Sequence, residues 1–419
     1  METVDVVVVG AGPAGAAAAI DLARRGRDVV VIDKAVFPRD KCCGDGLTTG
    51  ALRQLDALGL DPSTVASWQP VDGCWVRSPS GRIAEFPFPV DGLYGAVARR
   101  TDLDAALVEL ARASGVKVHE DHAFAALQTS EQGVTVTVAG REPISARYVV
   151  AADGMWSPVR KALGLASSGY LGEWHAFRQY LHATGEDHRK LWVWFEEELL
   201  PGYAWSFPLP GGIVNVGFGI RRSPGQATRS MAEVWRRLLE IPHIARVVGD
   251  HPVAESPHRA WPIPAQLPTT TLTGAGGRVL FVGDAARATD PMTGEGIGQA
   301  IETGRLAGEA ISIAGPEHPG SAADHYQNVL DRGMAVDHRL SATLSRALTT
   351  PTGVRAAVRV ASSTDWTRRN FARWLFEDYP RALLATPRRW HAGMLRGPGA
   401  FATVAPAGDP SLTPTSTPR

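Results

Sequence analysis

The sequence has few cysteines, no net charge and no long apolar run. It holds three cysteines among 419 residues, Cys42, Cys43 and Cys74, and adjacent cysteines rarely meet disulfide geometry with each other. This cysteine usage predicts a protein of the reducing cytoplasm. No uninterrupted apolar stretch reaches the ~18 residues that a membrane-spanning helix needs. The first apolar run follows an acidic start and is broken by glycines and Pro13, so we expect neither a signal peptide nor a membrane span there.

The balance of charge argues against nucleic acid as a partner. Lysine plus arginine and aspartate plus glutamate number 43 each, so no global field attracts a polyanion. Histidines are scattered without an HxxxH pair, and the adjacent cysteines lack the spacing of a zinc site, so no metal is expected. The hydrophobic content of 44% is that of a globular protein. The function should therefore reside in small-molecule pockets, with no obligate protein partner.

A βαβ unit opens the chain, in the stretch "VDVVVVGAGPAGAAAAIDLARRGRDVVVIDK". Its β-branched residues predict two strands, and the alanines between them predict a helix. The turn from the first strand to the helix contains Gly10, Gly12 and Gly15, the GxGxxG pattern of a dinucleotide site. The first glycine permits the turn, the second lets a pyrophosphate approach the backbone, and the third lets helix and strand pack closely.

The end of the second strand indicates which dinucleotide is bound. Asp33 stands there, where a carboxylate can bind ribose hydroxyls. An acid at this position favours an adenosine with a free 2′-hydroxyl, and hence FAD or NAD rather than NADP. Ala14 and Lys34 adjoin these positions and are expected in the same cofactor site. A glycine turn without a ligand is the alternative, and it leaves Asp33 unexplained.

Two later segments decide between NAD and FAD. One is "VVAADGMWSPVRKALG", which contains Asp153, and the other is "GRVLFVGDAARATDPMTGEGIGQAIETG", which contains Asp284 and a glycine-rich helix start. Together with GxGxxG, in this order and spacing, they resemble the flavoprotein hydroxylase and geranylgeranyl reductase superfamily. The resemblance implies FAD as the cofactor.

The resemblance also implies cofactor contacts, residue by residue. It places Asp284 at the ribityl and pyrophosphate region of FAD. It places the helix N-terminus after Gly296 at the flavin pyrimidine edge, where a helix dipole stabilises the negative charge of the reduced flavin. Arg100, in "RRTDLD", matches a family arginine that touches FAD; a surface arginine near a helix start is the alternative. Asp153 is expected to be structural or close to the cofactor, since a strand-end Asp-Gly is also an ordinary turn. The remaining cofactor positions are Gly283, Pro291, Gly294 and Ile297.

The architecture expected from this resemblance is an α/β fold with a Rossmann-like FAD-binding domain of the glutathione-reductase and p-hydroxybenzoate-hydroxylase type. Aromatic-rich strands in the middle of the chain predict a β-rich substrate domain, and a helical, arginine-rich C-terminal region follows. The proline-rich, polar end is predicted to be disordered. The expected divisions are 1–76, 97–167 and 277–332 for the discontinuous FAD-binding domain, 77–96 and 168–276 for the substrate domain, 333–400 for the helical region and 401–419 for the tail.

The stretch "GYAWSFPLPGGIVNVGFG" predicts an aromatic wall. Strand alternation points Tyr203, Trp205 and Phe207 to one face. The pattern YxWxFP, followed by Gly217 and Gly219, matches that of geranylgeranyl reductases and implies substrate-binding residues. Such a wall suits an isoprenoid, which gains about 0.8 kcal/mol for each CH₂ group buried. The alternative is that the three aromatics are ordinary core.

The motif "KCCGDGL" completes the resemblance. It aligns Cys43 with a cysteine of the family and leaves Cys42 as the variable position. Cys43 and Gly44 are therefore expected beside the flavin, and Asp45 would add a carboxylate to an apolar cavity. The alternative for Cys43 is a small buried hydrophobe in a loop.

The resemblance implies an FAD-dependent oxidoreductase that reduces an isoprenoid double bond. Reduced FAD would deliver hydride to one carbon, and a proton would reach the other from Cys43, Asp45 or Tyr203, none of which stands out as the donor. The motifs "PRDKxCGDGLT", "AVAR" and "GEGI" resemble most closely the bacterial branch that saturates the menaquinone prenyl chain. No second dinucleotide fingerprint is visible, so NAD(P)H or another electron donor would dock transiently.

Two other functions fit the same fold. A flavin monooxygenase acting on a terpenoid or aromatic substrate is the main alternative. Within that class, halogenases carry WxWxIP where this chain has YxWxFP, which favours a hydroxylase over a halogenase. A non-catalytic FAD binder or electron-transfer partner is the second alternative, and the complete aromatic motif argues against it.

The C-terminal stretch "DWTRRNFARWLFEDYPRALLATPRRWHAGMLRG" mixes aromatic residues with arginine. This mixture suits an amphipathic helix on the inner face of an anionic membrane. The interpretation that we prefer is a helical layer packed on the FAD-binding domain with its arginines at the surface. The sequence leaves the choice between peripheral membrane contact and simple packing open.

Overall fold

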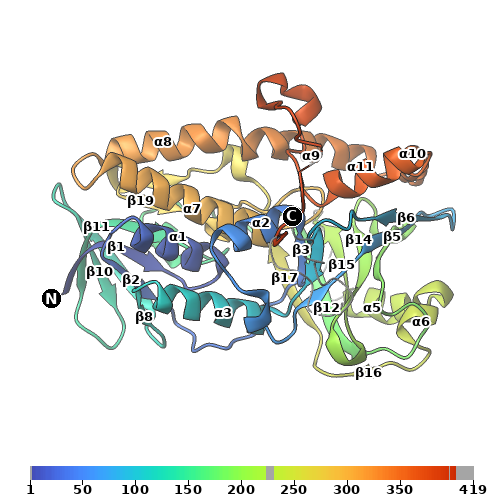
Figure 1. Cartoon of the computed structure of the whole chain (residues 1–419). Coiled ribbons are helices and arrows are strands. Elements are labelled where there is room, and N and C mark those ends of the chain that lie inside the picture. The colour runs from blue at the N-terminus through green and yellow to red at the C-terminus, as the bar shows by residue number, and fades with distance from the viewer. Residues whose placement is uncertain (1, 223–230, 396, 403–419) are drawn as a thin grey trace, which may run out of the picture.

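Two large sheets lie side by side beneath a helical layer in this computed structural model, which describes residues 2–222, 231–395 and 397–402 (Figure 1). The sheet near the N-terminus carries the glycine motif, and the other carries the aromatic stretch. The fold class expected from the sequence, α/β with a β-rich second part and a helical C-terminal region, is confirmed.

The first sheet is built around the buried valines of β1 (Glu2–Val9). β1 pairs in parallel with β2 (Val29–Ile32) and with β11 (Ile144–Ala151). Both faces of these strands are covered, so their sequences are continuous apolar runs. Its other strands are β8 (Lys117–His119), β9 (Phe124–Thr129), β10 (Val134–Val138), β18 (Thr273–Gly274) and β19 (Val279–Phe281). The order across the sheet is β18-β19-β11-β1-β2-β8, and β10 pairs with β11 and β9.

Helices pack on this sheet through small residues. α1 (Pro13–Arg24) lies so close to α7 (Ile297–Ala314) that a Cβ on Gly304 would fall 2.1 Å from the carbonyl oxygen of Ala14. The alanine-rich stretch after the glycine turn permits this approach, which unites two segments far apart in the sequence. The other helices of this half are α2 (Thr49–Ala57), α3 (Arg100–Ala113) and α4 (Pro158–Ala162).

The second sheet carries the aromatic stretch on β14 (Tyr203–Pro208), which pairs antiparallel with β15 (Ile213–Arg221). Its other strands are β5 (Gly73–Arg77), β6 (Ile83–Pro87), β12 (Trp174–His182), β13 (Leu191–Trp194), β16 (Val253–Ala254) and β17 (Arg259–Ile263). The order is β16-β12-β15-β14-β13-β5-β6, with β17 paired to β12. The division expected between residues 76 and 77 falls within β5. Helices α5 (Met231–Glu240) and α6 (Pro242–Val248) pack against each other and contribute buried side chains to the core of this half.

A short sheet lies in the segment between the glycine motif and α3. It consists of β3 (Gly46–Thr48), β7 (Gly95–Val97) and β4 (Gln69–Pro70), in the order β3-β7-β4. Because β3 begins one residue after Asp45, this sheet holds the cysteine motif in place: the amide of Ala98 donates to the carbonyl oxygen of Asp45 at 3.0 Å.

The helical layer consists of α8 (Pro319–Arg332), α9 (Met334–Ala347), α10 (Pro351–Ala361) and α11 (Asp365–Leu375), along the top of the view (Figure 1). On α11, Phe371 packs against Phe86 of β6 with ring centroids 4.8 Å apart. This helix therefore packs on the second sheet. Phe401, the first residue of the expected disordered tail, is 5% exposed and packs edge-on against Trp68. Residues 403–419 of that tail lie outside the described residues.

Candidate functional site

A cavity of about 730 Å³ extends from the glycine turn of the first sheet to the aromatic strand of the second. Its wall includes the β1–α1 turn, the cysteine motif, β14, β17 and the loop before α7. Most residues selected from the sequence line it: Gly10, Gly12, Ala14, Asp33, Lys34, Cys43, Gly44, Asp45, Arg100, Asp153, Tyr203, Trp205, Phe207, Gly219, Gly283, Asp284, Gly294, Gly296 and Ile297. The glycine motif and the aromatic wall therefore face one space.

The other selected residues, Gly15, Gly217 and Pro291, lie behind this wall. A Cβ on Gly15 would fall 1.8 Å from the carbonyl oxygen of Gly10, so only glycine lets α1 approach its own turn. A Cβ on Gly217 would fall 2.4 Å from the indole of Trp205, which lies opposite it on β14. The carbonyl of Pro291 accepts a hydrogen bond from Trp174 Nε1 at 3.1 Å. These residues shape the cavity without lining it.

The glycine turn leaves the N-terminus of α1 without a side-chain cap. Gly10 takes φ +102°, and a Cβ there would fall 2.3 Å from the carbonyl oxygen of Ala152. Asp33 braces the turn, since its Oδ2 accepts from the amide of Ala11 at 2.7 Å and its Oδ1 from that of Ala35 at 2.8 Å. Uncapped amides at a helix N-terminus are donors for a pyrophosphate. This end of the cavity therefore fits FAD.

Lys41 also lines this cavity, although we did not select it from the sequence. Its Nζ lies 3.8 Å from Asp284 Oδ2 and 3.9 Å from the ring centroid of Trp261. Burial lowers the pKa of Lys41, against the attraction of Asp284. The lysine stands in the "KCCGDGL" motif, but no local pattern indicated that it would meet Asp284.

Arg100 is buried rather than at the surface, with 8% of the residue exposed. Its Nε and Nη2 each donate to Asp104 at 2.7 Å, and Arg39 Nη1 lies 2.8 Å from the same carboxylate. Burial opposes the charge, but Asp104 outweighs it and holds the pKa of Arg100 above its usual range. Two guanidinium groups thus share one carboxylate, which leaves net positive charge near an anionic cofactor.

Asp153 occupies the turn that follows β11. Its Oδ2 accepts from the amide of Val159 at 2.9 Å, whereas its Oδ1 is buried without a hydrogen-bond partner among the described residues. Burial raises the pKa of Asp153 to about 6. The residue both braces the chain, as an ordinary turn would, and presents an unused acceptor beside the cavity.

The aromatic wall has the arrangement expected from strand alternation. The rings of Tyr203 and Trp205 are 6.0 Å apart at their centroids, and those of Trp205 and Phe207 are 6.1 Å apart. The Tyr203 hydroxyl donates to the carbonyl oxygen of Thr293, and burial raises the pKa of Tyr203. Its proton is therefore directed at the backbone, and the three rings, tilted against one another by 61° and 35°, form the aromatic wall of the cavity.

Asp45 is the fully buried carboxyl group at the aromatic end. Its backbone takes φ +65°, and its Oδ2 accepts from Tyr180 at 2.6 Å and from Asn215 Nδ2 at 2.8 Å. Its Oδ1 is buried without a hydrogen-bond partner among the described residues. Burial raises the pKa of Asp45 to about 6, against those two hydrogen bonds. Of the partners that sequence reasoning missed, Asn215 had a signal, as the one polar residue among apolar neighbours on β15, and Tyr180 had none.

Cys43 lies beside this carboxyl group. Its Sγ accepts from the amide of Asp45 at 3.3 Å, and its carbonyl accepts from Asn215 at 2.9 Å. Burial and the nearby Asp45 raise the pKa of the Cys43 thiol to about 11. The thiol is thus a neutral group that lines the cavity near neutral pH.

Three comparisons with known proteins agree with this geometry. The FAD binding domain family matches residues 3–315. A menaquinone reductase of Mycobacterium tuberculosis is 33% identical over 95% of this chain and 96% of its own length, and digeranylgeranylglycerophospholipid reductase 1 of Methanopyrus kandleri is 33% identical over 78% and 85%. The crystal structure of a geranylgeranyl bacteriochlorophyll reductase-like protein of Thermoplasma acidophilum superposes with a TM-score of 0.78 at 23% identity, covering 93% of this chain and all of that one. The chain therefore belongs to the FAD-dependent oxidoreductase family that includes the menaquinone and geranylgeranyl reductases, and FAD is its cofactor.

Proposed function

We propose that the protein reduces an isolated carbon–carbon double bond of an isoprenoid chain, such as the prenyl chain of a menaquinone. The observation that carries the proposal is the continuity of one cavity from the glycine turn to the wall of Tyr203, Trp205 and Phe207. The relatives named as menaquinone and digeranylgeranylglycerophospholipid reductases support the same substrate class. The aromatic wall offers an apolar chain a surface on which each buried CH₂ group gains about 0.8 kcal/mol.

FAD, when bound and reduced, supplies the hydride. The residues of this chain do the rest: the β1–α1 turn and Asp33 hold the dinucleotide, and the aromatic wall orients the alkene and excludes water. An isolated alkene accepts hydride poorly, so alignment in a dry cavity carries much of the rate acceleration. NAD(P)H or another donor reduces the flavin during a transient encounter.

Asp45 is the residue that we assign as proton donor. Its Oδ1 is free to carry a proton, while Tyr180 and Asn215 hold Oδ2 in place. The hydroxyl of Tyr203 is directed at Thr293, and the Cys43 thiol, with a pKa of about 11, is a weak acid. A carboxyl group whose pKa of about 6 lies near the working pH is the better general acid.

The direct test is an anaerobic turnover. The holoenzyme is reduced with dithionite and mixed with a menaquinone that has an unsaturated side chain, or with geranylgeranyl diphosphate, and products are analysed by mass spectrometry. We expect a product heavier by two hydrogens, and none from the oxidised enzyme. Oxygenated product in air, with substrate-dependent oxygen consumption and no reduced product, would instead establish a monooxygenase.

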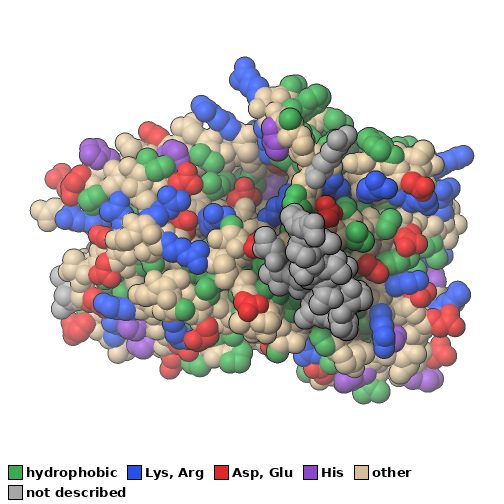
Figure 2. All heavy atoms as spheres, in the orientation of Figure 1, with side chains coloured by type: hydrophobic (Ala, Val, Ile, Leu, Met, Phe, Trp, Pro, Cys, Tyr) green, Lys and Arg blue, Asp and Glu red, His purple; other side chains and the backbone are tan. Residues whose placement is uncertain are grey.

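Peripheral membrane contact is the second part of the proposal, and it rests on the lobe formed by residues 383–395. This lobe, at the top of the molecule, presents hydrophobic and basic side chains (Figure 2), and Leu384, Trp390 and Leu395 are 87%, 55% and 42% exposed. Among the described residues, no helix is long and apolar enough to cross a bilayer. An exposed tryptophan near the exposed Arg388 suits an anionic interface.

Vesicle co-sedimentation tests this contact with the full chain. We expect binding to vesicles with anionic lipid, and weaker binding for the double variant Leu384→Ser, Trp390→Ser. The matched control is Val90→Ser, which removes a fully exposed apolar side chain elsewhere on the surface. Equal binding by all three proteins would remove the membrane role and leave the double-bond reduction untouched.

A further inference from the structure

Glu295 caps the N-terminus of α7, the helix end at which we expect the flavin pyrimidine edge. Its Oε1 accepts from the amides of Ile297 at 2.9 Å and Gly298 at 3.0 Å. The first amide bonded within the helix is that of Ala300, to Gly296 at 2.9 Å. Glu295 and Ile297 both line the cavity. The carboxyl group of Glu295 therefore accepts hydrogen bonds from amides that would otherwise be free to bind the cofactor.

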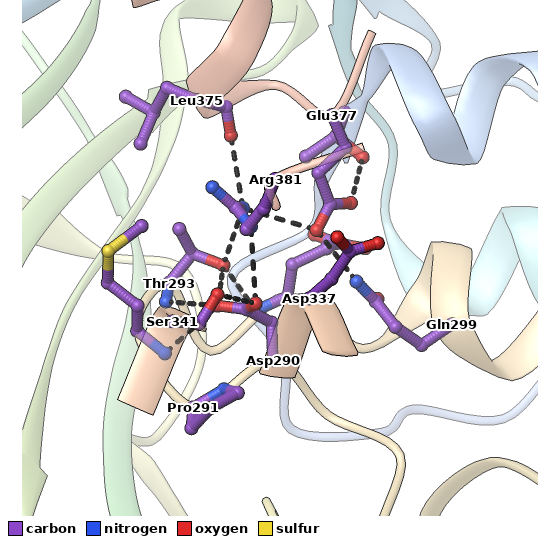
Figure 3. Close-up of polar contacts among 12 residues, drawn as sticks. Asp290, Pro291, Thr293, Gln299, Asp337, Ser341, Leu375, Glu377 and Arg381 are labelled. Atoms are coloured by element: carbon purple, nitrogen blue, oxygen red, sulfur yellow. Dashed lines mark hydrogen bonds and ion pairs between the residues drawn. The ribbon is translucent and has the colours of Figure 1, made fainter. Parts of the chain in front are cut away.

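A buried polar cluster joins the loop before α7 to the segment that follows α11 (Figure 3), and two of its members, Glu377 and Arg381, interact electrostatically with Glu295. Arg381 Nη2 donates to Glu377 Oε1 at 3.1 Å, and its Nε lies 3.2 Å from Asp290 Oδ2. Glu377 also accepts from Gln299 at 2.8 Å and from Thr48 at 3.2 Å. One guanidinium group thus pairs with the carboxyl groups of Asp290 and Glu377, and its charge also acts on Glu295.

In a buried cluster with more carboxyl groups than cations, a carboxylate binds a proton more readily than it does in water. Desolvation penalises each unpaired charge, and Arg381 already pairs with Asp290 and Glu377. Burial and the neighbouring Glu377 raise the pKa of Glu295, with Arg381 and the two capping amides opposing them. Within the described part of the chain, Cys43 and Tyr203 also interact electrostatically with Glu295, and burial raises the pKa of both, so they add no charge near neutral pH.

We propose that Glu295 takes up a proton from solvent when the bound FAD is reduced and releases it when the FAD is reoxidised. Two-electron reduction, with a proton bound at N5, leaves one negative charge at the N1 and O2 edge. A second negative charge at the same helix end is disfavoured, so the carboxylate binds a proton. Hydride transfer to the alkene would remove the negative charge from FAD, so Glu295 would release its proton to solvent while Asp45 would supply the proton that the other carbon gains. The inference rests on FAD lying at α7 and does not depend on which alkene is reduced.

The pH dependence of the flavin midpoint potential tests this proposal in the holoenzyme. Each proton taken up with the two electrons makes the reduction equilibrium tenfold less favourable per pH unit, about 30 mV. We expect a segment of about 59 mV per pH unit in the wild type, where two protons accompany reduction, and about 30 mV throughout in Glu295→Gln. The glutamine keeps the oxygen that accepts from the helix amides.

Glu377→Gln is the matched variant. It removes the neighbouring negative charge, lowers the pKa of Glu295 and therefore moves the start of the steep segment to lower pH without abolishing it. The inference would be overturned if the midpoint potential of the wild type changed by about 30 mV per pH unit at every pH. It would also be overturned if the segment of about 59 mV per pH unit persisted in Glu295→Gln. If Glu295→Gln binds no FAD, the inference is tested by the wild-type slope and by the shift, in Glu377→Gln, of the pH at which the steep segment begins. If the plot of midpoint potential against pH has the steep segment but the enzyme forms no reduced isoprenoid, this inference stands and the proposed function is wrong.

Discussion

The two ends of the cavity use different parts of the chain. At the glycine turn, backbone groups do the work: the uncapped amides of α1 face the cavity, and Asp33 braces them through two backbone hydrogen bonds. At the aromatic end, the contacts are made by side chains, and the fully buried carboxyl group of Asp45 is held by Tyr180 and Asn215. The comparison teaches that the glycine end is set by the backbone conformations that its residues permit. The aromatic end is set by the burial and the hydrogen bonds of each side chain.

A methyl group on the glycine turn should have the largest effect. In Gly10→Ala the new Cβ meets the carbonyl of Ala152 at 2.3 Å, at φ +102°, and such backbone strain alone costs of order 1–3 kcal/mol. We expect protein with little bound FAD, measured by absorbance after purification. Gly26→Ala is the control: it has φ +76° but nothing within 4 Å of its Cβ, so FAD content should be retained. Equal FAD content in the two variants would contradict the role of the turn.

Loss of the buried carboxyl group should be the next largest effect, and it should spare FAD binding. Asp45→Asn removes the assigned proton donor, so single-turnover alkene reduction should fall by roughly 10²–10⁴-fold. The protonated form is the donor, so the wild-type rate should fall as pH rises through about 6, whereas the variant should be slow and flat. Tyr203→Phe should lose less, because its hydroxyl donates to a backbone carbonyl. A large loss in Tyr203→Phe with none in Asp45→Asn would reverse the assignment.

Trimming the aromatic wall should have the smallest effect. Phe207→Leu removes one ring from the cavity, and an aromatic contact is worth about 0.5–1.5 kcal/mol, so KM for the isoprenoid should rise by roughly two- to tenfold. Phe218→Leu, on the neighbouring strand, alters a ring that packs on Phe177 in the core. That variant should lower the melting temperature and leave KM unchanged. A similar rise in KM in both would mean that Phe207 is ordinary core.

The sequence predicted the glycine end better than the aromatic end. Gly10, Gly12 and Asp33 stand in one βαβ unit, where strand and helix periods place them without reference to the rest of the chain. The strand period also placed Tyr203, Trp205 and Phe207 on one face. Contacts between distant segments lay beyond such reasoning: Lys41 lies 3.8 Å from Asp284, and no periodicity relates the two.

The sequence by itself determined the cofactor class, the turn that holds it and the apolar character of the substrate wall, because short-range sterics and residue periods set these features. Only the tertiary structure decided which carboxyl groups are buried and able to bind a proton near neutral pH. Asp45 meets Tyr180 and Asn215 at separations of 135 and 170 residues, and the charges that act on Glu295 include those of Glu377 and Arg381, which follow α11. The protonation of a buried carboxyl group depends on desolvation and on the charges around it, and both are created when distant segments pack together.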